Sequence, residues 1–291
     1  MKKVVLIASL VFTAVWLFPT TPVFASGEPN RIKIEYVAPE KPDQQKVYEL
    51  LRDRKVLEKL QIIFSPFRLP IDLHMITKSC GMVNAWYQRQ DRNAAVTICY
   101  ELLDYIAKHA PTKTTTVGIT REDGIIGHFF YVIAHEMGHA MFDLLDVPVF
   151  GGAEDAADRF SIYIMLQFGK EDSYRLITGA AHSYKTYIDK PELTLPLQAF
   201  SNVHNSSAQR FYNMLCLAYG ADPRTFAIAV QRGFLPKQRA GNCAREYWET
   251  QYAFKTLIRP HLDLELAKKV LNAEWLPPEG SRIPQPVPTL R

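Results

Sequence analysis

Residues 127–146 read GHFFYVIAHEMGHAMFDLLD, and this stretch decides most of what the sequence says about the fold. Apolar residues recur in it at spacings of three and four, namely at Phe130, Ile133, Met137, Ala140 and Leu144. Residues with these spacings share one face of a helix, so the pattern predicts one buried amphipathic helix. His135 and His139 are expected to face inward on this helix.

The segment His135-Glu136-Met137-Gly138-His139 has the pattern H-E-x-x-H. Residues four apart stack on one helix face, so both imidazoles can reach a single ion. Zinc with two histidines, one further protein ligand and a water forms an open catalytic site, and the carboxylate of Glu136 can take the proton of that water. The motif therefore predicts a peptide-hydrolysing centre with one zinc ion per chain. A pair of buried histidines that hydrogen-bond to the backbone is the alternative.

The residues after the motif restrict the third zinc ligand. A metzincin would have glycine at position 142 and histidine at position 145, whereas this chain has Phe142 and Leu145. The chain instead has a turn signal at Gly151-Gly152, after which a second helix is predicted from Ala153 to about Phe168. The metzincin pattern is therefore excluded, and the third ligand has to come from elsewhere in the chain.

The predicted second helix carries Glu154 and Asp158 one turn apart. In this respect it resembles the second helix of the gluzincin, or thermolysin-like, zinc peptidases. There a glutamate binds the metal, and an aspartate one turn later hydrogen-bonds a metal-binding imidazole. Carried over by position, the resemblance implies Glu154 as the third ligand and Asp158 as the carboxylate that fixes the imidazole tautomer. Asp155 stays open as a rival ligand, and acidic residues also favour a helix N-terminus for electrostatic reasons alone.

The N-terminal segment indicates export from a bacterial cell. Lys2 and Lys3 form a basic start, residues 4–18 an apolar core, and Val23-Phe24-Ala25 a small-residue cleavage pattern. We expect residues 1–25 to be a signal peptide, with the mature protein periplasmic or secreted. An uncleaved anchor is the alternative, although the apolar run is shorter than the roughly 20 residues of a membrane span. No stable membrane span is expected after cleavage.

Length and composition favour a single catalytic domain. Hydrophobic residues make up 47% of the 291 residues and charged residues 22%, which suffices for a sizeable core. No linker or repeat divides residues 26–276, so we expect one domain there, followed by a Pro-rich tail at 277–291. The formal net charge is +4, and Lys2 and Lys3 of the expected signal peptide contribute to it. A nearly neutral mature chain lacks the excess of basic residues that is typical of nucleic-acid-binding proteins.

Four cysteines, Cys80, Cys99, Cys216 and Cys243, form an even set without a C-x-x-C metal or redox spacing. Cysteines of this kind form disulfides by default in an exported protein. Of the three possible connectivities, we expect Cys80 with Cys99 and Cys216 with Cys243, because each bridge then closes one supersecondary unit.

The remaining periodicities predict an α+β fold. Strand-like segments lie at residues 31–37, 71–76, 83–88 and 94–100, and the last is a candidate for an edge strand above the zinc helix. Helical spacing of apolar residues predicts helices over residues 43–63, 171–190, 207–220, 223–232, 243–258 and 262–271.

The mature chain also resembles, over most of its length, a bacterial family of exported metallopeptidases. The carriers of this resemblance are Ser79-Cys80-Gly81 with Asn84-Ala85, Ile98-Cys99-Tyr100-Glu101, residues 135–158, His204 with residues 209–213 (QRFYN) leading to Cys216, and Leu235-Pro236 to Cys243. The resemblance implies proteolysis and a zincin-like α+β fold. In such a fold a small mixed sheet packs on the H-E-x-x-H helix, and a mainly helical C-terminal half follows.

The same resemblance draws attention to His204, which lies in the polar segment SNVHNSS before a predicted helix. A histidine stabilises the oxyanion in thermolysin-like enzymes, so His204 is a candidate for this catalytic role. A surface or capping histidine is the alternative. Tyr212, Tyr131 and Arg210 are further candidates for the same donor.

These features together predict an exported zinc metallopeptidase that acts on a peptide or protein substrate. Another zinc amide hydrolase of the cell envelope is the second hypothesis, and a non-catalytic, zinc-stabilised periplasmic binding or scaffold protein is the third. The intact Glu136 argues against a scaffold, because a binding protein has no need of a general base beside the metal.

Overall fold

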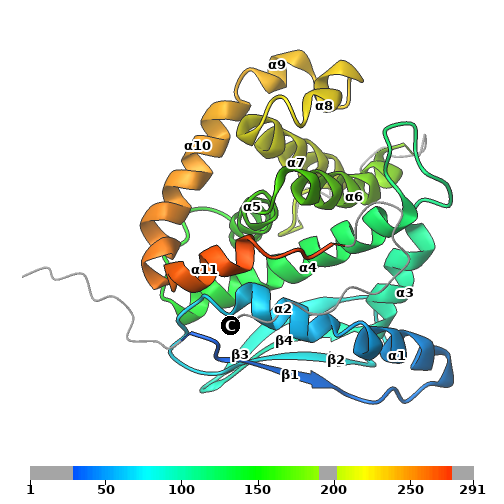
Figure 1. Cartoon of the computed structure of the whole chain (residues 1–291), viewed down its shortest axis with the longest axis vertical. Helices are drawn as coiled ribbons and strands as arrows, with labels where there is room; N and C mark the ends of the chain where they lie inside the picture. The colour runs from blue at the N-terminus through cyan, green and yellow to red at the C-terminus, as the bar shows by residue number, and fades with distance from the viewer. Residues whose placement is uncertain (1–28, 190–201, 277–291) are drawn as a thin grey trace, which may run out of the picture.

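A computed structural model describes residues 29–189 and 202–276 of the chain. The expected signal peptide, residues 1–25, and the expected Pro-rich tail, residues 277–291, lie outside the described residues. The described part has an α+β fold, in which one small sheet lies at one end of the molecule and helices form the rest (Figure 1). The predicted fold class and the mainly helical C-terminal half are confirmed at this level.

Four strands of the described part form one mixed sheet: β1 (Ile32–Tyr36), β2 (Leu73–Lys78), β3 (Ala85–Gln90) and β4 (Asn93–Cys99). Their order is β1-β2-β4-β3. Strands β1, β2 and β4 run parallel, and β3 is antiparallel to β4. The hairpin between β3 and β4 turns at Asp91, whose φ of 54° lies in the left-handed region that such tight turns require.

The edge strands of this sheet are β1 and β3, and β3 is the one that packs against α4, so the prediction of an edge strand at residues 94–100 is wrong. Strand β4 is buried at nearly every position, because it pairs with β2 on one side and with β3 on the other. Strand β3 ends in the exposed residues Gln88, Arg89 and Gln90, and polar side chains of this kind protect an edge.

The helix predicted over residues 43–63 is interrupted. It consists of the 3-10 turn η1 (Pro42–Gln44) and two helices, α1 (Gln45–Asp53) and α2 (Val56–Phe64). The interruption lies at Lys55, which has a φ of 50° and therefore cannot continue a right-handed helix. Helix α2 packs against β1. A further helix that was not predicted, α3 (Tyr100–His109), follows β4 directly.

The helix that carries the H-E-x-x-H motif is α4 (Arg121–Leu144), and it begins before the predicted start at Gly127. A capping box sets this start: Asp123 N–H donates to Thr120 Oγ1 at 3.1 Å, and Thr120 N–H donates to the Asp123 carboxylate at 3.1 Å. Helix α4 packs against β3 and β4 and also against α5 (Ala153–Met165) and α6 (Lys170–Ile188). It is consequently buried on several faces rather than along one stripe.

Glycines let the neighbouring helices approach α4 closely. A Cβ at Gly127 would lie 2.4 Å from the carbonyl oxygen of Leu176 on α6. At Gly138, within the motif, a Cβ would lie 3.1 Å from Phe160 Cδ1 and 3.3 Å from Ala157 Cα, both on α5. This approach brings the acidic first turn of α5 next to the histidines of α4.

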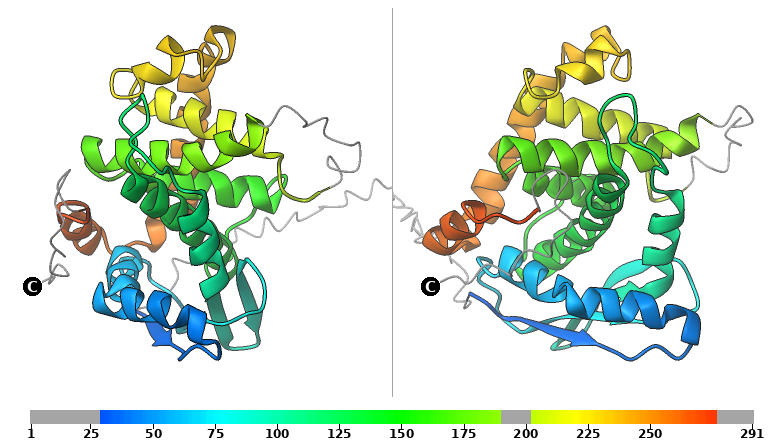
Figure 2. Two further views of the ribbon diagram at one scale, coloured as in Figure 1. Left: turned by 90° about the vertical axis from the view of Figure 1, so that its right-hand side faces the viewer. Right: turned by 45° about the vertical axis from the view of Figure 1, so that its right-hand side comes forward.

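The C-terminal half is mainly helical, as predicted. It comprises α7 (Ser207–Ala221), α8 (Ala227–Gln231), α9 (Lys237–Ala240), α10 (Cys243–Ala253) with the π-helical turn η3 (Phe254–Ile258), the 3-10 turn η4 (Arg259–His261) and α11 (Leu264–Leu271). Figures 1 and 2 show α7, α8 and α9 at the end of the molecule opposite the sheet, whereas α11 returns to α2. Helix α8 is shorter than the predicted helix over residues 223–232, and α9 was not predicted.

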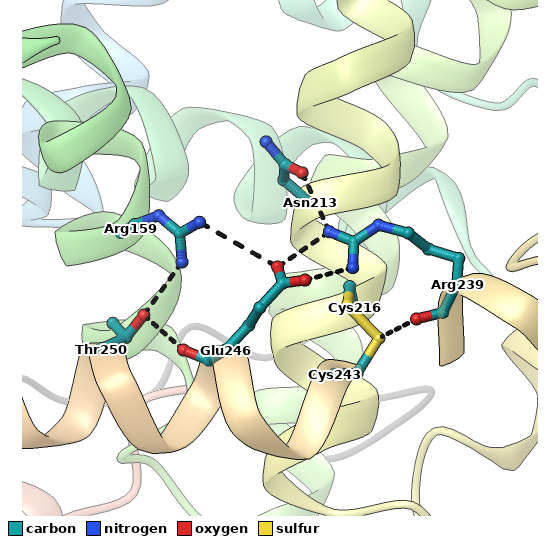
Figure 3. The surroundings of a disulfide bond; sticks show 7 residues. All are labelled: Arg159, Asn213, Cys216, Arg239, Cys243, Glu246 and Thr250. Atoms are coloured by element: carbon teal, nitrogen blue, oxygen red, sulfur yellow. Dashed lines mark hydrogen bonds and ion pairs between the residues drawn. A yellow bond between two sulfur atoms is a disulfide. The ribbon is translucent and has the colours of Figure 1, made fainter. Parts of the chain in front are cut away.

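Both predicted disulfides are present. Cys80 is joined to Cys99 at the end of β4, and Cys216 on α7 is joined to Cys243 at the start of α10. Figure 3 shows Glu246 beside the second bridge, where it contacts Arg239 and lies 4.0 Å from Arg159 of α5. The surroundings of this disulfide thus connect α10 to the helix that carries Glu154 and Asp158. Within residues 29–189 and 202–276, no helix has the length and apolar character needed to cross a membrane.

Candidate metal centre

The histidines of the H-E-x-x-H motif and the first turn of α5 meet in one cluster. His135 Nε2 lies 3.2 Å from His139 Nε2. Glu154 Oε2 lies 3.0 Å from His135 Nε2 and 3.5 Å from His139 Nε2. The side chains of His135 and Glu154 are 5% and 21% exposed. Helix α4 thus supplies two imidazoles to the cluster and α5 supplies one carboxylate.

Asp155, the rival candidate ligand, does not join this cluster. Its side chain accepts a hydrogen bond from Asn205 Nδ2, and the residue is exposed. Of the two neighbouring acids, the structure brings Glu154 and not Asp155 to the histidines.

Asp158 lies one turn further along α5 and contacts the far side of the His135 ring. Its Oδ1 atom is 2.7 Å from His135 Nδ1, and it accepts hydrogen bonds from Tyr131 Oη at 2.6 Å and Arg210 Nη2 at 2.5 Å. Burial raises the pKa of Asp158, but the hydrogen bond to His135 and the charge on Arg210 lower it further than burial raises it. An ionised carboxylate can only accept, so Nδ1 of His135 carries a proton, and Nε2 faces the cluster.

The pKa values of the cluster residues show that its carboxylates favour a positive charge beside them. Burial lowers the pKa of His135, but the hydrogen bonds to Asp158 and Glu154 raise it to about 9. The hydrogen bond with His135 lowers the pKa of Glu154 to about 2. Burial lowers the pKa of His139, which keeps that imidazole neutral. A site that holds carboxylates ionised beside imidazoles in a partly buried setting suits a cation.

Glu136 points from α4 toward the edge strand β3. Its Oε2 atom accepts a hydrogen bond of 3.0 Å from the backbone N–H of Tyr87. Burial raises the pKa of Glu136 to about 7. A carboxyl group with such a pKa can both take up and release a proton near neutral pH. The contact between β3 and Glu136 was not predicted, because strand pairing set by long-range contacts decides which strand lies at the edge.

His204 reaches the cluster from the loop before α7. Its Nε2 atom lies 2.8 Å from Glu154 Oε2, and its side chain is 46% exposed. The loop ends in a capping box, in which Ser206 Oγ accepts from the backbone N–H of Gln209 at the start of α7. The structure thus brings His204 to the cluster, and its role as an oxyanion donor stays a prediction.

The other predicted donors lie elsewhere. Tyr131 and Arg210 lie behind His135, where both donate to Asp158, and the Arg210 guanidinium lies over the rings of Tyr131 and Tyr184 at 5.4 and 5.1 Å. Tyr212 packs edge-on against Phe211. The ion pair of Arg210 with Asp158 was missed, although an arginine within the apolar stretch of α7 is a signal for a buried partner.

The donor set fits a zinc ion. Nε2 of His135, Nε2 of His139 and Oε2 of Glu154 lie 3.0 to 3.5 Å from one another. Donors around a tetrahedral zinc with bonds of about 2.0–2.2 Å lie about 3.3 Å apart. Two imidazoles and a carboxylate are also the chemistry of catalytic zinc sites. Cys80, Cys99 and Glu101 form another group of potential ligands, but both cysteines are in a disulfide and offer no thiolate.

A cavity lies elsewhere, between residues 115–119 and helices α6, α7 and α8. Its lining is mostly apolar and includes none of the cluster residues. Lys185 and Asp189 of this lining form an ion pair with each other. Of these two places, the cluster between α4 and α5 is the one that holds the candidate metal ligands.

Comparisons with known proteins agree with the chemistry of the cluster. Residues 36–258 match the model of a protein family described as "Putative metallopeptidase". The matched region covers most of the chain and includes His135, Glu136, His139, Glu154 and His204. No curated protein and no solved structure gives a significant match.

Proposed function

The chain belongs to this metallopeptidase family, and from that premise we propose that it is a zinc-dependent peptidase with its active site between α4 and α5. The observation that carries the proposal is the meeting of three donor atoms, from His135, His139 and Glu154, next to the half-buried carboxylate of Glu136. A metal ligand set and a separate carboxylate beside it are what hydrolysis of a peptide bond requires.

His135, His139 and Glu154 would hold one zinc ion per chain, and Asp158 orients His135 through Nδ1. When bound, zinc supplies Lewis acidity toward water and toward the carbonyl oxygen of the scissile peptide bond. Tyr131 and Arg210 donate hydrogen bonds to Asp158 and so hold its carboxylate against His135.

Glu136 acts in this proposal as the general base and then as the general acid. It takes the proton of the attacking water as the C–O bond forms, and it passes the proton to the leaving amine as the C–N bond breaks. The Tyr87 N–H holds the Glu136 carboxylate at 3.0 Å from the edge strand. His204 would donate from Nε2 to the oxygen anion that forms on the attacked carbonyl.

The substrate in this proposal is a peptide or protein segment outside the cytoplasm. An extended peptide can lie along β3, because an edge strand offers unpaired backbone groups. Residues 1–25 would direct export to the periplasm or the medium, and residues 26–276 would form the single mature domain. The two disulfides support an oxidising compartment.

Replacement of the general base tests the proposal. Glu136→Gln should keep the bound zinc and the fold but lower peptide hydrolysis by at least about 100-fold, because only the proton acceptor is lost. Zinc content by elemental analysis and turnover of a peptide library measure the two effects separately. Glu122→Gln, a partly exposed carboxylate in the first turn of the same helix, is the matched control and should change neither.

Two outcomes contradict the proposal. Wild-type turnover in Glu136→Gln shows that another group is the base. Stoichiometric zinc in a wild-type protein that cleaves no peptide or amide bond favours the non-catalytic scaffold instead.

A further inference from the structure

Three imidazole nitrogens approach the same carboxylate oxygen. Glu154 Oε2 lies 2.8 Å from His204 Nε2, 3.0 Å from His135 Nε2 and 3.5 Å from His139 Nε2. The ligand atoms of His135, Glu154 and His204 all lie within 4.8 Å of one another. The separations of 2.8 to 3.5 Å around Glu154 Oε2 are close to the roughly 3.3 Å between neighbouring donors around one zinc ion.

The position of His204 is too close to the ligands for an oxyanion donor alone. A donor of this kind must lie about 2.7–3.1 Å from an oxygen of the substrate, with that oxygen between the donor and the metal. In the structure, Nε2 of His204 meets the ligand oxygen of Glu154 itself. The ring of His204 also lies nearly parallel to that of His135, at 24° and with a centroid separation of 6.0 Å.

Among residues 29–189 and 202–276, the loop of His204 is anchored through exposed side chains. Asn205 Nδ2 donates to Asp155 on α5, the helix that also carries Glu154. The His204 N–H donates to Asn202 Oδ1 at 2.9 Å. Asp155 and His204 are exposed, and Val203 beside them is 76% exposed. Exposed hydrogen bonds contribute little net free energy, so the loop can leave the site at low cost.

We propose that His204 is a displaceable fourth zinc ligand, which closes the metal site in the resting protein and is released when a peptide binds. Zinc sites with four protein ligands are closed and structural, whereas catalytic sites keep one position open. A fourth ligand on an exposed loop would give one site two forms: closed while the ligand is bound, and open after it leaves. Release of the imidazole opens the position that the substrate needs and leaves His204 free to donate to the oxyanion. The inference rests on the proposed zinc site.

Counting the ligated imidazoles tests the inference without an activity assay. The full mature chain is loaded with Co²⁺ alone, and proton NMR counts the histidine rings whose signals are shifted by the paramagnetic ion. We expect three ligated histidines in the wild type and two in His204→Ala. His74→Ala, which removes an exposed histidine on β2, is the matched control and should keep three.

Zinc affinity gives a second measurement. Competition with a chelator should show that His204→Ala binds zinc at least about 10-fold more weakly, since a ligand is lost and not merely its support. Asn205→Ala keeps the imidazole but removes the anchor to Asp155, so it should keep three ligated histidines and bind zinc a few-fold more weakly. Equal affinity of His204→Ala and the wild type contradicts the inference.

Displacement is tested in Glu136→Gln, which binds a peptide without cleaving it. Addition of a peptide that the wild type hydrolyses should reduce the ligated histidines of the Co²⁺ protein from three to two. Three ligated histidines in the peptide complex would overturn displacement. Two ligated histidines in the peptide-free wild type would overturn the fourth ligand but leave the proposed peptidase intact. A wild type that binds neither Co²⁺ nor Zn²⁺ would overturn the proposed function itself.

Discussion

The two sides of the candidate metal centre are built differently. On the helix side, His135 and Asp158 lie between α4 and α5, and their side chains are 5% and 10% exposed. On the loop side, His204 has a 46% exposed side chain and is held through its neighbours Asn202 and Asn205. The groups that concentrate charge are therefore buried in a hydrogen-bond network, whereas the group that would face a substrate lies on an exposed loop.

The energetics of burial explain this difference. A buried carboxylate such as Asp158 is costly unless its charge is compensated, and here Arg210, Tyr131 and His135 all contact one of its oxygens. Such a network holds its members in one geometry, which is what a metal ligand needs. An exposed loop hydrogen bond contributes only about 0.5–1.5 kcal/mol, so the loop side can exchange partners.

The largest expected effect separates the two adjacent acids at the start of α5. Glu154→Ala should weaken zinc binding by more than about 100-fold, because loss of a ligand exceeds the roughly 10 to 100-fold cost of losing a ligand's support. Asp155→Ala removes only the contact with Asn205 on the loop side and should change zinc affinity by less than about 10-fold. Competition with a chelator measures both. The reverse pattern would move the third ligand to Asp155.

A smaller effect is expected from the support of His135. Asp158→Asn should weaken zinc binding by about 10 to 100-fold, because the amide orients His135 less strongly and leaves the charge of Arg210 uncompensated. Thermal unfolding with and without zinc separates loss of affinity from loss of fold. Tyr131→Phe removes one of the three contacts to Asp158 and serves as the milder control. Wild-type affinity in Asp158→Asn would show that the helix side does not need this carboxylate.

The helix side could be predicted from the sequence because its geometry is local. His135 and His139 are one helical turn apart, so their spacing places both imidazoles on one helix face. Glu154 on the next helix was expected from the resemblance to the gluzincin second helix, and spacing alone left Asp155 open. The disulfides were predictable for the same reason, since each closes a short segment. The start of α4 was predicted at Gly127 and is at Arg121, although Thr120 and Asp123 have the spacing of a capping box and could have marked it.

The rest depends on contacts between distant segments. The order of the strands places β3 at the edge and its Tyr87 N–H at Glu136, and no local pattern specifies strand order. The ion pair of Arg210 with Asp158 joins α7 to α5 across 52 residues. The interruption at Lys55 has neither glycine nor proline to announce it, so helical spacing alone predicted a continuous helix there.

The smallest expected effect concerns the distance between α4 and α5, which sets the geometry of the helix side. In Gly138→Ala the new Cβ would lie 3.1 Å from Phe160 Cδ1 and 3.3 Å from Ala157 Cα, so α5 must shift by a few tenths of an ångström. Overpacking of this kind costs about 1–3 kcal/mol, whereas alanine favours a helix over glycine by about 1 kcal/mol. The net loss of stability should therefore be about 1 kcal/mol by chemical denaturation.

The shift of α5 in Gly138→Ala would move only one of the three proposed metal ligands. Zinc affinity of Gly138→Ala should fall by less than about 10-fold, because Glu154 moves with α5 while His135 and His139 stay on α4. Gly169→Ala is the matched control, since a Cβ there meets no atom within 4 Å and the site is untouched. If Gly138→Ala is more stable than the wild type and binds zinc equally well, the close approach of α4 and α5 does not limit the geometry of the site. The rigidity of the helix side would then rest on the hydrogen bonds to Asp158 alone.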